Sequence, residues 1–486
     1  MNFPSVYPVA CHTDHIGQGS TFVAIQGTKS NGIDFIPLAL QKGATTIVIA
    51  EGADVPSSTL ELLEQKNAQM LCVENTRKAL AELSAKALGD PAKKLSIIGI
   101  TGTKGKTTTA FMLEHILYNA GYKTALLSSV YNKIDQTVFS TQLTTNQPDY
   151  LHVFFEQCVQ AGVEFVVMEV AAQAFTLDRV SGILFDGVIF TNFDQEHAEF
   201  YSTIEDYFAA KKQIFSQLHV NAPVIFNGDD TWCSKIAREQ NYFTFGLKRN
   251  ADIIGRILKN DPTGLKLELA TTDEQCTVEL PSIVGEFNAY NIVAAAGMAA
   301  ALGVCLCNSK RALETFSGVP GRMQKHIVTN DIHYVIDYAH NPSSFVAVLS
   351  TLKLSYDYVI VVFGCGGERD KVKRPIMGGI AAHYADCVVL TTDNPRSEEQ
   401  QTIVEEILVG VPAEYEHKIV IELDRKRAIE KSFDLAKKNT VIAVLGKGPD
   451  EYQLIKDEKI YFSEKMIIEQ LKNPIAVTNN IYEISK

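Results

Sequence analysis

Short apolar runs alternate with amphipathic segments along most of the chain, as expected when parallel strands are joined by crossover helices. Near the start, β-rich runs at Thr21–Ile25 and Thr45–Ile49 flank a helical pattern at Ile36–Gln41. The segment Gly89-Asp-Pro-Ala-Lys-Lys that follows is typical of a link between domains. We therefore predict a small N-terminal α/β domain over residues 1–93.

Two further series of apolar runs follow, separated by the turn cluster Ser317-Gly-Val-Pro-Gly321. The first series predicts a central domain over residues 94–319, with a parallel sheet and a mononucleotide site. The second series predicts a Rossmann-like α/β domain over residues 320–486, with a loosely attached end beyond Asn473. The predicted strands are Leu95–Ile100, Phe165–Val170, Gly187–Thr191 and Pro223–Asn227, then Tyr334–Asp337, Val359–Gly364, Cys387–Thr392 and Val441–Gly446. Three domains also fit 486 residues at roughly 150 residues per domain.

Composition narrows the classes of partner. The formal net charge of -12 argues against a broad nucleic-acid surface, so local cation clusters must hold any anionic ligand. Nine cysteines are scattered, and the close pair Cys305 and Cys307 lacks a second pair or a histidine at metal-ligand spacing. We find no basic-then-apolar leader and no apolar run near the about 18 residues that span a membrane. We expect a cytoplasmic monomer with reduced thiols that binds small molecules and neither nucleic acid nor membrane.

The most informative motif is Ile98-Gly-Ile-Thr-Gly102-Thr-Lys-Gly105-Lys106-Thr107-Thr108-Thr109. It joins the predicted strand Leu95–Ile100 to a predicted helix at Ala110–Leu117, which aims backbone N–H groups and a helix N-terminus at an anion. Lys106 is expected to meet the β/γ-phosphates and Thr107 a Mg²⁺ ion. The strict phosphate-loop pattern fails because Ile100 stands at its first glycine. An ordinary glycine-rich turn is therefore the alternative.

This loop resembles the ATP loop of the Mur ligases, the ATP-dependent amide-forming enzymes of peptidoglycan synthesis. Further blocks resemble the family in order and spacing, across nearly the whole chain. They are Met168-Glu-Val, Thr191-Asn192, Glu196-His197, Ala210-Lys211-Lys-Gln-Ile-Phe215, Gly285-Glu-Phe-Asn288-Ala-Tyr-Asn291, Pro320-Gly-Arg322-Met, Asp337-Tyr-Ala-His340, Phe363-Gly-Cys-Gly-Gly-Glu-Arg-Asp370, Lys373-Arg374-Pro, Asp393-Asn-Pro-Arg396 and Gly446-Lys-Gly448.

The resemblance implies that ATP phosphorylates a carboxylate and that an amine attacks the resulting acyl phosphate. It assigns catalysis to Lys106, and it implies that Glu169 and His197 hold a second Mg²⁺ ion. Lys211 corresponds to a lysine that the family carries as a carbamate, an anionic metal ligand, although Lys212 lies beside it. Taken alone, His197 is more often a satisfied polar residue, and both lysines fit a solvated helix face.

The resemblance also implies the remaining nucleotide contacts. Asn288 and Asn291 would recognise adenine, and Arg322 and Asp337 would contact phosphate and ribose, whereas His340 is a weaker assignment. The full set expected at ATP is Gly102, Thr103, Lys104, Gly105, Lys106, Thr107, Thr108, Asn288, Asn291, Arg322 and Asp337.

In the third domain, Asp393-Asn394-Pro395-Arg396 resembles the signature of family members that add meso-diaminopimelate instead of lysine. A forked arginine can bind the distal carboxylate of that amino acid, and acidic and amide oxygens can take its ammonium. Arg374, Gly446 and Asp450 match further family contacts, with Asp450 in the usual place of a glutamate. In isolation, Asn394-Pro395 is merely a good turn.

The site for the family's nucleotide-sugar dipeptide shows departures. Thr13, Thr144, Thr145 and Arg179 match expected contacts. The differences are Ala171, Ala172 and Gln173 in place of a serine pair and a histidine, Leu177 in place of a glutamine, and His12-Thr13-Asp14 in place of Asp-Ser-Arg. An aspartate near a diphosphate would repel it unless that side chain faces away or pairs with a cation.

Three hypotheses follow. The favoured one is the ligase that adds meso-diaminopimelate to the D-glutamate of UDP-N-acetylmuramoyl-L-alanyl-D-glutamate. The second is a related ligase for another amino acid, such as L-lysine, or another acidic acceptor, such as a folate or a polyglutamate chain. The third is a catalytically silent relative that binds ATP, which the intact Lys106, Glu169, His197 and Lys211 disfavour. Arg396 discriminates between the first two.

Overall fold

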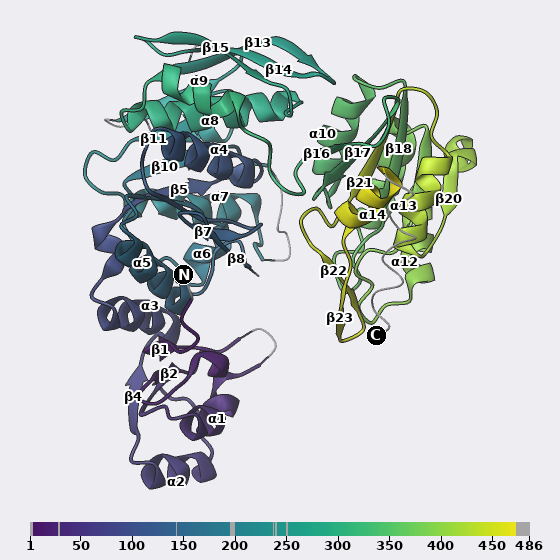
Figure 1. Cartoon of the computed structure of the whole chain (residues 1–486). Helices are drawn as coiled ribbons and strands as arrows, with labels where there is room; N and C mark the ends of the chain where they lie inside the picture. Colours follow the sequence, from purple (N-terminus) through teal and green to yellow (C-terminus); the bar gives the residue numbers. More distant parts are fainter. Residues whose placement is uncertain are drawn as a thin grey trace, which may run out of the picture. The chain divides into compact units, whose positions relative to one another are not determined.

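The computed structural model describes residues 3–27, 30–141, 143–194, 200–236, 238, 241–248 and 251–472. The chain divides into two compact α/β units (Figure 1). The first unit comprises Met1–Gly255, Leu269–Cys276 and Tyr290–Leu313, and the second comprises Arg256–Glu268, Thr277–Ala289 and Glu314–Lys486.

The first unit begins with a small module, drawn in purple in Figure 1. Its sheet has the parallel order β1-β2-β3-β4. The elements are β1 (Val9–Ala10), β2 (Thr21–Val23), α1 (Ile36–Gln41), β3 (Thr46–Ala50), α2 (Ser57–Gln65), β4 (Gln69–Val73) and α3 (Thr76–Ala87). Apolar side chains of β2 and β3, such as Phe22 and Ile47, pack with Ile36 and Leu40 of α1. The predicted strand-helix-strand pattern is confirmed here.

An eleven-stranded sheet follows, in the order β15-β14-β13-β12-β11-β10-β5-β9-β6-β7-β8. Its strands are β5 (Ser96–Thr101), β6 (Thr124–Leu127), β7 (Asn132–Ile134), β8 (Thr137–Phe139), β9 (Phe165–Glu169), β10 (Gly187–Phe190), β11 (Val224–Asn227), β12 (Tyr242–Gly246), β13 (Ile253–Asp261), β14 (Gly264–Ala270) and β15 (Gln275–Leu280). Its helices are α4 (Lys106–Asn119), α5 (Pro148–Ala161), α6 (Ala172–Thr176), α7 (Ile204–Lys212), α8 (Glu286–Ala301) and α9 (Leu306–Glu314).

The strands from β12 to β6 in this order are parallel, as predicted. At one edge, β7 and β8 instead pair antiparallel, which the alternating pattern did not predict. Since β5, β9 and β10 are parallel neighbours, their carboxyl ends meet at one edge, where open α/β sheets bind ligands.

The second unit has a six-stranded sheet in the order β16-β17-β21-β18-β19-β20, in which β16 alone pairs antiparallel. Its elements are β16 (Gln324–Ile327), β17 (Ile332–Asp337), α10 (Pro342–Lys353), β18 (Tyr358–Phe363), α11 (Lys373–Tyr384), β19 (Cys387–Leu390), α12 (Gln400–Leu408), β20 (Ile419–Ile421), α13 (Arg425–Asp434) and β21 (Thr440–Leu445). A hairpin, β22 (Tyr452–Ile455) and β23 (Glu458–Tyr461), and α14 (Glu464–Lys472) complete it.

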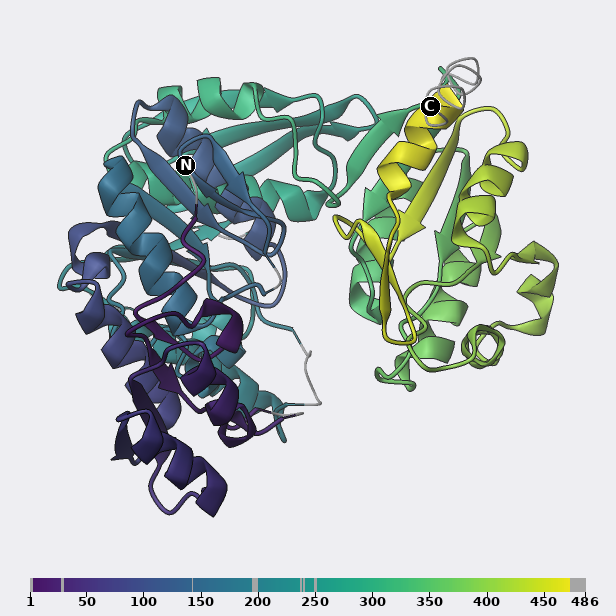
Figure 2. The same cartoon turned by 60° about the horizontal axis from the view of Figure 1, so that its bottom comes forward.

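Alternate residues of β18 enter two different cores. Val359 and Val361 pack with the cluster that contains α10, α11 and α12 residues, whereas Ile360 and Val362 pack with α13 and α14 residues. Figure 2 shows helices on either side of this sheet. The unit is therefore doubly wound, as the continuous apolar strands predict.

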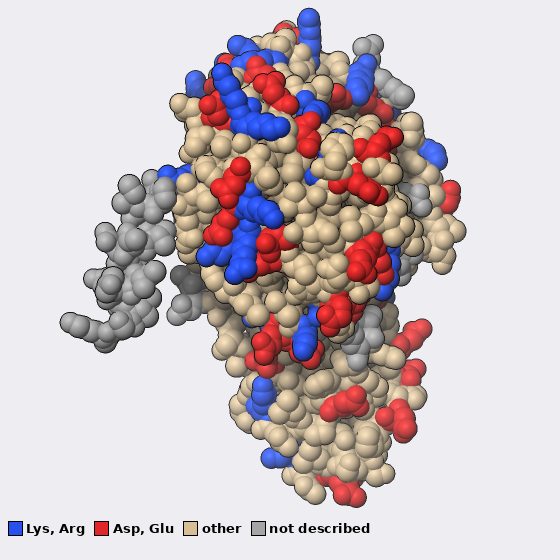
Figure 3. All heavy atoms as spheres, turned by 90° about the vertical axis from the view of Figure 1, so that its right-hand side faces the viewer, with Lys and Arg blue, Asp and Glu red and all other residues tan. Residues whose placement is uncertain are grey.

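Among the described residues, no helix is both long and apolar enough to cross a bilayer. On the face drawn in Figure 3, basic and acidic side chains lie interspersed among uncharged surface. Acidic neighbours therefore offset much of the positive charge on that face.

Candidate active site

The phosphate loop occupies the turn between β5 and α4, at the carboxyl edge of the first unit's sheet. Gly102 and Gly105 have φ of +133° and +81°, a backbone region that L side chains rarely adopt. A Cβ atom at Gly102 would lie 2.1 Å from Thr191 Oγ1, and one at Gly105 would lie 2.3 Å from Asn291 Oδ1. The predicted strand-loop-helix is confirmed, and both glycines are required by its geometry.

Residues at the end of β10 hold this loop in place. Asn192 accepts hydrogen bonds from Thr103 N through its backbone and from Lys104 N through its side chain, both at 2.9 Å. The Asn192 amide donates to Lys104 O at 2.9 Å, and Thr191 Oγ1 donates to the same oxygen at 2.6 Å. The loop is therefore shaped by the protein itself.

Lys106 and Thr107 are the first two residues of α4, directly after the glycine-rich loop. Lys106 Nζ donates to Gly102 O at 3.0 Å and to Thr103 O at 2.9 Å, so its ammonium stays at the loop. Thr107 Oγ1 donates to Glu169 Oε2 at 3.0 Å and lies 3.0 Å from Ser129 Oγ. Ser129 N donates to the other oxygen of Glu169 at 2.8 Å.

Thr107, Ser129 and Glu169 bring two hydroxyls and a buried carboxylate together. Hard oxygen donors of this kind suit Mg²⁺, so the residues present fit the implied metal. Among the described residues, no group of three or more His, Cys, Asp or Glu side chains is arranged to hold a metal ion. His197 lies outside the described residues. Ser129 was not predicted as a site residue. The only sequence feature that could have indicated it is its position just after the strand β6.

The neighbouring lysines of α7 differ in environment. Lys211 is 1% exposed, donates from Nζ to Gly102 O at 2.7 Å and lies 4.6 Å from the centre of the Tyr207 ring. Lys212 is exposed and lies 5.2 Å from the Phe208 ring. The lysine matched to the family carbamate is therefore the one that faces the phosphate loop.

The two asparagines of α8 contact nearby backbone and side chains. Asn291 Oδ1 accepts from Thr109 Oγ1 at 3.3 Å, so this amide lies against the first turn of α4. Asn288 Nδ2 donates to Val284 O at 2.8 Å, two residues before the start of α8. Thr108 is buried on α4.

In the second unit, Arg322 and Asp337 lie at one end of the sheet. The Arg322 guanidinium stacks 4.4 Å from the centre of the Tyr338 ring. Asp337 accepts from Met323 N at 2.7 Å and from Ala339 N at 2.8 Å. Burial raises the pKa of the Asp337 carboxyl, and the nearby Arg322 charge opposes that shift. His340 Nδ1 lies 2.8 Å from Tyr338 O and is exposed.

Residues matched to the nucleotide-sugar site lie in the first unit. Thr13 is buried, and its carbonyl accepts from Lys42 Nζ at 2.9 Å. The same ammonium lies 3.6 Å from the Asp14 carboxylate. Asp14 therefore does pair with a cation, which reduces the repulsion expected toward a diphosphate.

Thr145 connects this region to Glu169. Its hydroxyl donates to Glu169 O at 3.0 Å and accepts from Ala171 N at 3.1 Å, while Arg179 Nη1 donates to Thr145 O at 2.9 Å. Arg179 Nε is buried and has no hydrogen-bond partner among the described residues. Thr144 is half-buried beside them.

The Asp393-Asn394-Pro395-Arg396 loop follows β19 in the second unit. Asn394 Oδ1 accepts from Leu454 N at 2.9 Å and from Lys447 Nζ at 3.1 Å. Lys447 is 1% exposed and lies 3.8 Å from the Asp393 carboxylate. Lys447 was not predicted as a contact, although it stands inside the Gly446-Lys-Gly448 block.

Arg396 has a left-handed backbone, with φ of 51°. Its Nη1 donates to Gly367 O at 2.7 Å, and burial lowers the pKa of its guanidinium. A Cβ atom at Gly446 would lie 2.6 Å from Asp393 Oδ2, so these two loops touch. Burial raises the pKa of Asp450, with Lys447 opposing that shift.

Arg374, by contrast, is fully buried and bound within the unit. Its Nη1 pairs with Glu398 at 2.9 Å and with Glu406 at 2.5 Å, and its Nη2 donates to Gly366 O at 3.0 Å. Arg374 and Arg396 thus donate to the neighbouring carbonyls of Gly366 and Gly367, and Arg374 Nε is buried with no hydrogen-bond partner among the described residues.

Family models and named relatives match most of the chain. Models of the Mur ligase family catalytic domain, the Mur ligase middle domain and the Mur ligase glutamate ligase domain match residues 6–87, 100–299 and 321–448. The UDP-N-acetylmuramoyl-L-alanyl-D-glutamate–2,6-diaminopimelate ligase of Clostridium botulinum is 36% identical over 463 residues, which cover 94% of this chain and 93% of that protein.

Solved structures show the same fold. A UDP-N-acetylmuramoyl-L-alanyl-D-glutamate–2,6-diaminopimelate ligase aligns with a TM-score of 0.65 and 25% identity, covering 96% of this chain and 95% of that one. The MurF ligase of Thermotoga maritima in complex with ADP aligns with a TM-score of 0.64 and 21% identity, covering 97% of each chain. The chain belongs to the Mur ligase family.

Proposed function

We propose that this chain is the ATP-dependent ligase that joins meso-diaminopimelate to the D-glutamate of UDP-N-acetylmuramoyl-L-alanyl-D-glutamate in peptidoglycan synthesis. The Clostridium botulinum relative is named for this reaction and matches almost end to end. The observation that carries the choice of amino acid is the Asp393–Arg396 loop, which presents an arginine beside a carboxylate and an amide. ATP, the nucleotide-sugar dipeptide and the amino acid are its small-molecule substrates.

The chemistry requires activation, because a carboxylate does not react with an amine near neutral pH. The acceptor carboxylate attacks the γ-phosphorus of ATP, releases ADP and becomes an acyl phosphate. The amine then attacks the acyl carbon and phosphate leaves. Backbone N–H groups of the phosphate loop and the Lys106 ammonium stabilise the negative charge of both steps.

Thr107 and Ser129 would hold the magnesium ion at the phosphates, and Glu169, His197 and a carbamylated Lys211 would hold a second one near the acceptor carboxylate. Bound magnesium would neutralise charge on the phosphates. Support for Lys211 comes from its burial and from its position against Gly102 O. Burial favours the neutral amine of a lysine, which is the form that attacks CO₂ to give a carbamate.

Asn288, Asn291, Arg322 and Asp337 would complete the ATP contacts. Thr13, Thr144, Thr145 and Arg179 would contact the nucleotide-sugar dipeptide, where the buried and unpartnered Arg179 Nε offers a donor. Asp393, Asn394, Arg396, Gly446 and Asp450 would bind the diaminopimelate, with Arg374 supporting their loop.

A substrate panel tests this function. Purified enzyme with ATP and the nucleotide-sugar dipeptide is given meso-diaminopimelate, L-lysine or another amine, and the product mass is measured. We expect the meso-diaminopimelate product to dominate. The Arg396→Lys variant should lose about 10- to 100-fold in kcat/KM for meso-diaminopimelate, because a point ammonium cannot reproduce the bidentate fork, while its KM for ATP stays unchanged.

Two outcomes would contradict the proposal. Equal use of lysine and meso-diaminopimelate by the unaltered enzyme would remove the amino-acid assignment. Product formation only with a different acidic acceptor, such as a folate or polyglutamate, would remove the acceptor assignment.

A further inference from the structure

The two loops proposed to hold the amino acid both leave the sheet beside a single buried arginine. Asp393 follows Thr392 after β19, and Gly446 directly follows Leu445 at the end of β21. Arg425 Nη1 donates to Thr392 O at 3.3 Å, and Arg425 Nη2 donates to Leu445 O at 2.8 Å. One guanidinium therefore ties together the starting points of both loops.

Glu464 fixes the orientation of this guanidinium. Its Oε1 accepts from Arg425 Nε at 2.8 Å and pairs with Nη2 at 2.6 Å. Arg425 and Glu464 are the first residues of α13 and α14 and are 2% and 3% exposed. An unpaired buried charge is costly, so the Arg425 guanidinium stays with the Glu464 carboxylate. This ion pair orients the guanidinium toward the carbonyls of Thr392 and Leu445.

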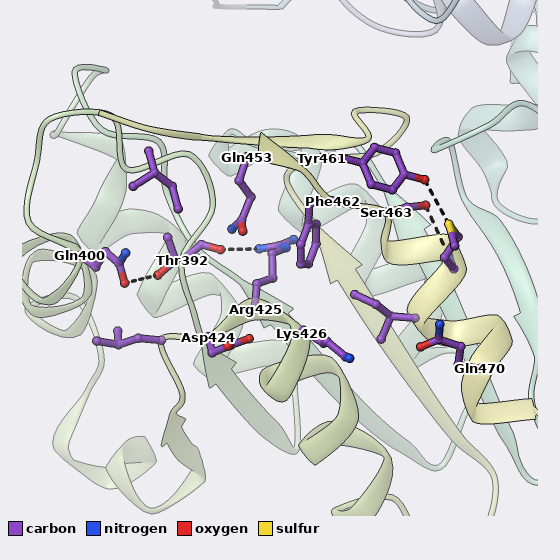
Figure 4. A pocket seen from close by; sticks show the side chains of 14 residues that line it. Thr392, Gln400, Asp424, Arg425, Lys426, Gln453, Tyr461, Phe462, Ser463 and Gln470 are labelled. Atoms are coloured by element: carbon purple, nitrogen blue, oxygen red, sulfur yellow. Dashed lines mark hydrogen bonds between the residues drawn. The ribbon is translucent and has the colours of Figure 1, made fainter. Parts of the chain in front are cut away.

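A pocket of about 630 Å³ adjoins this arrangement (Figure 4). Thr392, Arg425 and Gln453 line it, and Figure 4 shows Arg425 between Thr392 and Phe462. Gln453 Nε2 donates to Asp393 O at 3.0 Å. The start of the Asp393–Arg396 loop is therefore held by hydrogen bonds from both Arg425 and Gln453.

We propose that Arg425 is a positioning residue for the amino-acid substrate, which sets the separation of the Asp393–Arg396 and Gly446–Asp450 loops and is itself oriented by Glu464. The inference rests on the proposed function, since it takes the amino acid to bind at these loops. Arg425 acts through the two backbone carbonyls and not by touching the substrate.

The test is the Arg425→Ala enzyme. Its KM for meso-diaminopimelate should rise by about ten-fold or more, the effect of losing charge-assisted hydrogen bonds, while its KM for ATP changes by less than about two-fold. Free guanidinium, below the concentration that unfolds the protein, should restore part of the lost affinity because the pocket leads to the vacated position. Arg425→Lys should give an intermediate KM, since an ammonium cannot reach both carbonyls in the same geometry.

Lys426→Ala is the matched control. Lys426 is the next residue of α13 and lines the same pocket, but it pairs with Glu430 on the helix surface, at 3.8 Å. Both KM values should stay unchanged in this variant.

Unchanged KM for meso-diaminopimelate in Arg425→Ala, or an equal rise in both KM values without guanidinium rescue, overturns the inference. If Arg425→Ala does not fold, Glu464→Gln takes its place, because glutamine keeps the side-chain volume and one acceptor oxygen. This variant should raise the KM for meso-diaminopimelate more modestly. An unchanged KM for meso-diaminopimelate in Glu464→Gln also overturns the inference. Failure of the proposed function is seen separately, in unaltered enzyme that does not use meso-diaminopimelate. The comparison is then run with the amine that this enzyme does use.

Discussion

At the scale of single residues, the structure shows how protein groups orient the charged side chains of the proposed site. Lys106 is held by two carbonyls of its own loop, Glu169 by a hydroxyl and a backbone N–H, and Lys447 by Asn394 and Asp393. Such fixed charges need little rearrangement when substrate charge arrives, which is how preorganised sites stabilise transition states. The phosphate loop and the Asp393–Arg396 loop both have this property.

Of the residues in the phosphate loop, we expect Lys106 to contribute most to the rate of phosphoryl transfer. Lys106→Ala removes the phosphate cation, so kcat/KM for ATP should fall by about 100-fold or more. The melting temperature should change little, because the loop keeps its anchors at Thr191 and Asn192. Steady-state kinetics and thermal unfolding measure both effects. Lys93→Ala, at a surface lysine paired with Asp90, is the control. A near-normal rate in Lys106→Ala would remove the phosphate-loop assignment.

Residues missed from the sequence share one reason. Ser129, Lys447 and Arg425 act through partners 20 or more positions away in the chain, so no local spacing marks them. Lys106 and Thr107, in contrast, belong to a short motif whose geometry is local. Sequence could therefore predict the phosphate loop, but only the folded chain shows which side chains support it.

At the scale of elements, strand ends bring the chemistry together. Most of the buried parallel strands were predicted within one or two residues, because continuous apolar runs mark strands that are covered on both faces. The parallel strands β6 and β12 were not predicted. The antiparallel strands β7 and β8 and the hairpin β22–β23 were not predicted. These strands are only three or four residues long, so each offers too few positions for a clear apolar pattern.

The turn from β5 to α4 depends on Gly105 in two ways. Gly105→Ala places a side chain at φ of +81° and 2.3 Å from Asn291 Oδ1. Gly121 follows the other end of α4 at φ of +98° with open space around it, so Gly121→Ala carries the backbone cost alone. We expect Gly121→Ala to lose about 1 kcal/mol in the free energy of unfolding. Gly105→Ala should lose more, together with ATP affinity.

Chemical denaturation and ATP titration of the two variants measure this difference. Equal losses of stability, with ATP affinity retained in Gly105→Ala, would show that the loop tolerates a side chain and is not shaped as described.

At the scale of the whole molecule, the residues proposed for the two halves of the reaction belong to different compact units. The first unit contains the phosphate loop, Glu169 and Lys211, and the second contains the Asp393–Arg396 loop with its buried supports. The phosphate loop follows the parallel strand β5, and the Asp393–Arg396 loop follows the parallel strand β19. The chain is thereby equipped to activate a carboxylate and to select an amine.

The most direct test of this account follows an oxygen atom. Both oxygens of the reacting D-glutamate carboxylate in the nucleotide-sugar dipeptide are labelled with ¹⁸O. The labelled dipeptide is incubated with enzyme, ATP and meso-diaminopimelate. The released phosphate is then analysed by mass spectrometry. If the carboxylate attacks the γ-phosphorus and the amine then displaces phosphate, one labelled oxygen appears in each phosphate released. Unlabelled phosphate alongside amide product would contradict the acyl-phosphate route.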